Sequence, residues 1–210
     1  MFEFLTSADD AINILKKDHD KVKGLFDDFE KAEKRAQKIK IVTEAIMELK
    51  IHATIEEELF YPSLRGKQKV DQDLLNEADE EHHVAKLLIA ELEQMNGTES
   101  HYDAKFTVLS ENIRHHVKEE EGDLFPQARR TDVNFELLGK KLLQRKQQLK
   151  KNGIPLCAEE KMIAAQRKGS DDSPAKAAKK MKAPKLVKKS SAVSKASGKS
   201  ALALPKKARR

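Results

Sequence analysis

Two segments of this chain carry a histidine followed four residues later by a glutamate. The pairs are His52 with Glu56 and His116 with Glu120. On a helix this spacing places both side chains on one face. Two carboxylates buried in an apolar interior would be costly unless a cation lay beside them. The spacing therefore predicts that each segment contributes an imidazole and a carboxylate to a metal site.

Four histidines recur at intervals that a folded-back helical chain would bring to one level: His19, His52, His82 and His116. The midpoints between successive members fall near residues 35–36, 67 and 99. Gly66 and Asn96-Gly97 mark turns at the second and third midpoints, whereas symmetry alone places the first turn. The pattern of the first half also recurs 63–64 residues later, which predicts two similar helical hairpins.

Apolar residues at helical spacing dominate the first 150 residues, and no strand alternation competes with them. Gly (8) and Pro (6) are scarce, which disfavours a sandwich or barrel. The periodicity predicts helices over residues 8–34, 37–64, 72–95, 100–129 and 133–151. Long helices with short connections predict an all-α fold: an antiparallel up-down-up-down four-helix bundle with an additional C-terminal helix.

The candidate ligands are too many for one tetrahedral zinc ion. They are His19, His52, Glu56, His82, His116 and Glu120. Two six-coordinate metals bridged by the carboxylates would use all six, and mixed imidazole and carboxylate ligation suits iron or manganese. His83 and His115 lie about 100° around the helix from candidate ligands, and His101 lies at a helix start. We interpret these three as surface residues.

The net charge of +6 is unevenly distributed. From Arg167 to Arg210 there are 15 Lys or Arg and two Asp or Glu, a local charge of +13, which leaves −7 on residues 1–166. This stretch is rich in Lys, Ala, Ser and Pro, lacks aromatic residues and cannot bury enough apolar surface to fold. We therefore expect a folded domain over residues 1–152 and a disordered basic tail over residues 153–210.

The composition also limits the compartment. A single cysteine, Cys157, excludes an internal disulfide and fits a reducing environment. The longest apolar run, residues 87–90, is far shorter than the roughly 20 residues that span a bilayer. The N-terminus lacks the features of a secretory signal. These observations predict a cytoplasmic protein with no membrane partner, associated with the nucleoid if its tail binds DNA.

The paired His-x-x-x-Glu segments, with His19 and Glu81-His82, resemble the hemerythrin-like, or HHE cation-binding, domain over roughly residues 8–130. The resemblance implies a four-helix bundle around a non-haem di-iron centre (Fe2+/Fe3+), favouring iron over manganese or zinc. It implies the four histidines as terminal ligands and the two glutamates as bridging ligands. Oxygen-carrying hemerythrins have a further histidine where this chain has Lys86, which argues against simple reversible oxygen carriage.

These inferences predict a metal-binding protein that binds or senses oxygen, peroxide, nitric oxide or iron itself. One alternative is an enzyme that decomposes peroxide at the same metal site. Another is a nucleic-acid-associated protein whose basic tail, similar in composition to linker-histone tails, contacts phosphates without reading bases. The sequence defines neither the physiological ligand nor the oligomeric state.

Overall fold

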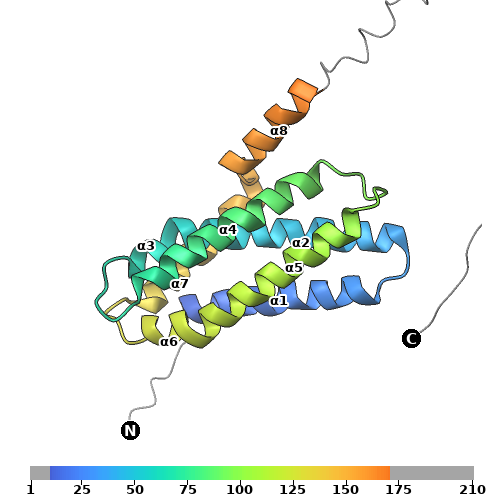
Figure 1. Ribbon diagram of the computed structural model, residues 1–210. Helices are drawn as coiled ribbons and strands as arrows, with labels where there is room; N and C mark the ends of the chain where they lie inside the picture. Colours follow the sequence, from blue (N-terminus) through green and yellow to red (C-terminus); the bar gives the residue numbers. More distant parts are fainter. Residues whose placement is uncertain (1–9, 171–210) are drawn as a thin grey trace, which may run out of the picture. The chain divides into compact units, whose positions relative to one another are not determined.

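The computed structural model describes residues 10–170, and this part of the chain consists of helices and connecting loops without strands. Four long helices run antiparallel to one another (Figure 1): α1 (Ala11–Lys31), α2 (Arg35–Ile55), α4 (Gln72–Glu93) and α5 (Tyr102–Glu119). A further helix, α7 (Phe135–Asn152), packs against α1 and α2. The predicted four-helix bundle with an additional helix is confirmed.

Two arms of the bundle contain a π-helical turn that helical periodicity did not predict. The turn η1 (Glu56–Phe60) leads into α3 (Tyr61–Leu64), and η2 (Glu120–Leu124) leads into α6 (Phe125–Ala128). The N–H of Tyr61 donates to the carbonyl of Glu56, and the N–H of Phe125 donates to that of Glu120. Each bond spans five residues, so the turn holds one more residue than an α-helical turn.

The apolar core is divided into two clusters. One contains Ile55, Phe60 and Leu124 and is covered by Leu138 and Leu142 of α7. The other lies toward the opposite end of the bundle and includes Val22, Phe26, Leu49 and Phe106. The buried histidines lie between the two clusters along the helices: His19, for example, falls between Leu15 of the first cluster and Val22 of the second. The bundle therefore surrounds a polar layer with apolar packing at both ends.

The ordered structure extends beyond residue 152. The segment at 158–170 forms α8 (Ala158–Ser170), which packs against α4, so the predicted disorder is wrong for these residues. Glu159 pairs with His83, and the buried Glu160 pairs with Lys50. These ion pairs hold α8 against the bundle, which explains why apolar periodicity did not reveal the helix. The rest of the predicted tail, from residue 171, lies outside the described residues.

No helix in residues 10–170 is long and apolar enough to cross a membrane.

The loop between α4 and α5 provides a test of the packing. Gly97 has a φ of +86°, and a Cβ there would lie 2.5 Å from Cγ1 of Ile39. We expect Gly97→Ala to lower the free energy of unfolding by about 1–3 kcal/mol, measured by urea denaturation. Gly24→Ala is the control, because Gly24 is in α1 with open space around it. It should raise stability by about 0.5–1 kcal/mol. Equal stability of the two variants would contradict the packing.

Candidate metal centre

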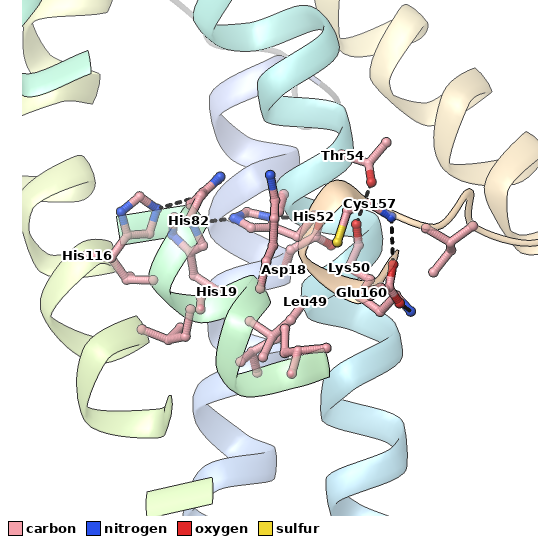
Figure 2. Close-up of a pocket in the computed structure, with 18 of the residues that line it drawn as sticks. Asp18, His19, Leu49, Lys50, His52, Thr54, His82, His116, Cys157 and Glu160 are labelled. Atoms are coloured by element: carbon pink, nitrogen blue, oxygen red, sulfur yellow. Dashed lines mark hydrogen bonds and ion pairs between the residues drawn. The ribbon is translucent and has the colours of Figure 1, made fainter. Parts of the chain in front are cut away.

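Each of the four long helices contributes one buried histidine to a single layer (Figure 2). His19 comes from α1, His52 from α2, His82 from α4 and His116 from α5, and each is at most 6% exposed. The two glutamates of the His-x-x-x-Glu pairs, at the starts of the π turns, are exposed by 1% or less. The structure thus brings together all six residues singled out from the sequence.

The histidines form two pairs. The Nε2 atoms of His19 and His52 are 3.1 Å apart, and those of His82 and His116 are 3.2 Å apart. The two rings of each pair meet edge to face, with centroids 4.7 Å apart. Each pair therefore directs two ring nitrogens at a common point.

Glu56 lies between the two pairs. Its Oε2 is 3.0 Å from Nε2 of His52 and 3.5 Å from Nε2 of His82. Glu120 bridges the pairs in the same way, because its Oε2 is 3.3 Å from Nε2 of His19 and 3.6 Å from Nε2 of His116. Each carboxylate can therefore serve two metal positions at once.

The oxygens of these carboxylates are poorly satisfied by the protein. Within the described residues, both oxygens of Glu56 and Oε2 of Glu120 are buried without a hydrogen bond of normal geometry. Only Oε1 of Glu120 has such a bond, from the hydroxyl of Tyr61 at 2.9 Å. Buried anionic oxygens without donors are costly. Four imidazole nitrogens facing these oxygens form a donor set that fits two cations.

Each of the four histidines has a carboxylate at its Nδ1 atom. The partners and distances are Glu121 for His19 at 2.9 Å, Asp18 for His52 at 3.5 Å, Glu57 for His82 at 2.9 Å and Glu81 for His116 at 2.7 Å. We call these four the outer carboxylates. The contacts of Glu121, Glu57 and Glu81 are hydrogen bonds in which the carboxylate accepts the Nδ1–H, whereas Asp18 lies at ion-pair distance only. Such a contact leaves Nε2 free to bind a metal, as is usual in metal sites.

Three of the outer carboxylates are paired with lysines. The pairs are Lys23 with Glu121 at 3.0 Å, Lys86 with Glu57 at 2.6 Å, and Lys146 with Asp18. Lys23 and Lys86 occupy equivalent positions in the repeat, 63 residues apart. The lysine at position 86 is therefore one member of a repeated Lys-Glu-His arrangement.

The sequence reasoning missed these outer groups. The acidic runs that contain Glu57 and Glu121 have the appearance of a solvated face, yet both side chains are about 70% buried. The signal that could have revealed them is their repetition beside Glu56 and Glu120.

Charge interactions in the layer shift several pKa values. Burial alone would lower the pKa of His52, but Glu56 and Asp18 outweigh this effect and raise it to about 10. Burial would raise the pKa of Glu120, but His116 and His19 hold it well below its usual range. Against the effect of burial, Glu120 and Glu81 also raise the pKa of His116. Without a metal, protons on His52 and His116 thus supply positive charge beside the buried carboxylates.

A cavity of about 50 Å³ adjoins the histidine layer. Its inner walls include Val22, Leu49 and Ile113, and the loop after α7 contributes Ile154 and Cys157. Cys157 and His52 line the same cavity (Figure 2). Burial raises the pKa of its thiol to about 11, so the thiol is neutral near pH 7. The cavity therefore offers a small, largely apolar space next to the imidazoles.

Comparison with known proteins agrees with this geometry. Residues 10–128 match the Hemerythrin HHE cation binding domain, and the chain belongs to this family. Uncharacterized proteins of Mycobacterium tuberculosis and Mycobacterium bovis are each 29% identical to it over 150 residues, which cover 70% of this chain and 89% of theirs. The crystal structure of a Hemerythrin HHE cation binding domain-containing protein from Mycobacterium kansasii is 27% identical with a TM-score of 0.57. The match covers 68% of this chain and 88% of that one.

The pKa shifts predict how the metal-free protein responds to pH. The raised pKa of His52 contributes stability that is complete below pH 6.5 and is lost as the pH rises to about 10. We expect the free energy of unfolding, measured with urea in the presence of a chelator, to fall over that interval. In His52→Gln this fall should be much smaller. An equal fall in both proteins would contradict the attribution of this pH dependence to His52.

Proposed function

We propose that this protein binds two iron ions at His19, His52, Glu56, His82, His116 and Glu120, and uses them to bind or sense a small ligand. The observation that carries this proposal is the placement of two buried carboxylates, each facing both imidazole pairs with unpartnered oxygens. The two groupings of candidate ligands share Glu56, as expected for a bridging ligand.

The donor set supports iron as the metal. Four imidazole nitrogens and two carboxylate oxygens exceed the four ligands of a structural zinc site, and the layer contains no thiolate. Two divalent cations would bring more positive charge than Glu56 and Glu120 neutralise. The outer carboxylate Glu81, which has no lysine partner among the described residues, lies beside the layer and is placed to offset part of this excess. A bound iron pair would supply electrons and open coordination positions for a diatomic molecule or peroxide.

The surroundings support a small ligand. A cavity of about 50 Å³ beside the imidazoles suits oxygen, nitric oxide or peroxide better than a larger substrate. Val22, Leu49 and Ile113 keep this space apolar, and Tyr61 holds its proton beside Glu120. Position 86 holds a lysine that pairs with Glu57, so no fifth imidazole is available there. We therefore favour sensing or turnover over oxygen carriage. Oxygen evolution from peroxide by the iron-loaded protein would identify the enzymatic alternative.

Metal analysis tests the proposal. We expect two irons per chain and a visible charge-transfer band after oxidation. Glu56→Gln should lose both irons because Glu56 faces both pairs. Glu121→Gln should retain the stoichiometry but bind iron about 10–100-fold more weakly, because it affects only the Nδ1 partner of His19. His101→Ala, at an exposed histidine outside the layer, is the matched control. Fewer than two irons in the unmodified protein would contradict the proposal.

A second role, in non-specific nucleic-acid binding, is proposed from the charge of +13 on residues 167–210. Phosphate binding by lysine and arginine releases counterions and weakens steeply with salt. In gel-shift assays, we expect the full chain to bind DNA regardless of sequence and a chain truncated after residue 170 to bind at least about tenfold more weakly. Equal binding by the two proteins would exclude this role for the tail.

A further inference from the structure

One of the four outer carboxylates differs from the others in its charge environment. Glu121, Glu57 and Asp18 each have a lysine within ion-pair distance. Glu81 has none in the described part of the chain, although it makes the shortest of the four contacts to a histidine Nδ1, 2.7 Å from that of His116. The corner of the histidine layer at Glu81 thus lacks the fixed positive charge found at the other three.

Two side chains of α5 face Glu81 from the outer surface. Nε2 of His115 is 3.2 Å from an oxygen of Glu119 and 3.7 Å from Oε1 of Glu81. Candidate ligand atoms of these three residues all lie within 4.8 Å of one another. The side chain of His115 is 59% exposed, so solvent reaches the cluster. His115 and Glu119 are four residues apart on α5 and therefore project from the same side of the helix.

The internal repeat explains why this corner is open. The positions equivalent to His115 and Glu119 in the first half are Ile51 and Ile55. Both isoleucines are buried in the cluster that α7 covers, and α7 also supplies Lys146 to Asp18. Among residues 10–170, no helix covers α5 in the corresponding way. The corner at Glu81 therefore has neither an apolar cover nor a lysine.

We propose that Glu81, His115 and Glu119 bind a divalent transition-metal ion, such as Zn2+ or Mn2+, on the outer surface. One imidazole and two carboxylates with open positions for water are a ligand set that such ions accept. The ion supplies the positive charge that lysines supply at the other corners. Glu81 connects the two sites, because one of its oxygens faces the surface ion while the other accepts from His116.

The geometry also indicates the character of the site. Three protein ligands, one of them more than half exposed, make a site that exchanges with solvent and binds more weakly than the buried layer. Its occupancy therefore depends on the metal supply, and it adds charge next to a histidine of the buried layer. The surface residues offer the same ligands whichever metal the buried layer holds.

Equilibrium dialysis of the iron-loaded protein against Zn2+ tests the proposal. The comparison is with His115→Lys, which gives this corner the lysine present at the other three and removes the imidazole ligand. We expect the unmodified chain to bind one more exchangeable Zn2+ than the variant, or to bind it at least about tenfold more tightly. Iron content and melting temperature should be the same for both. The surface site is measured as the Zn2+ bound by the unmodified chain minus the Zn2+ bound by the variant. Any Zn2+ that enters the buried layer is common to both proteins and cancels.

Two further variants make the test specific. Glu119→Gln should also lose the exchangeable Zn2+, and it gives a result even if His115→Lys folds poorly. His83→Ala is the matched control, because His83 is an exposed histidine with a single carboxylate partner, Glu159, at 2.6 Å. It should retain the exchangeable Zn2+. Equal Zn2+ binding by the unmodified chain, His115→Lys and Glu119→Gln would overturn the proposal.

Discussion

The structure depends on one electrostatic constraint: two carboxylates, Glu56 and Glu120, are buried at the centre of a helical bundle, and only one of their four oxygens accepts a hydrogen bond, from the hydroxyl of Tyr61. Such groups require positive charge nearby. Protons on His52 and His116 can provide it, or metal ions held by the four surrounding imidazoles can. The outer carboxylates orient these imidazoles, and lysines in turn balance three of those carboxylates. Successive shells of opposite charge thus extend from the centre to the surface.

The internal repeat provides equivalent histidines, glutamates and lysines from its two halves, but the halves are not identical. Tyr61 and Phe125 follow the two π turns at equivalent positions of the repeat. The hydroxyl of Tyr61 donates to Glu120, whereas Phe125 stacks on the ring of His19 with centroids 5.8 Å apart. One imidazole pair therefore has a hydroxyl nearby and the other has an apolar ring. Two metals held here would experience different surroundings, although their ligand sets are alike.

The sequence predicted the bundle and the convergence of the six central residues because both depend on helical spacing. The π turns were not predictable in this way, since the helix that follows each of them has only four residues, too few to reveal a one-residue shift in the apolar pattern. Glu57 and Glu81 could not be distinguished from surface acids, because their role depends on contacts with a different helix. The helix α8 escaped detection because charged pairs such as Lys50 with Glu160 dock it, and periodicity reports only apolar faces.

The chain beyond the family match at residue 128 completes the site in two ways. The helix α7 supplies Lys146, the only lysine in the described residues that pairs with Asp18. The loop that follows it places Ile154 and Cys157 in the wall of the cavity. Without this extension, Asp18 would lack its lysine and the cavity would lose part of its wall. The matched domain contains all six candidate ligands, whereas part of the charge balance and of the cavity wall comes from residues outside it.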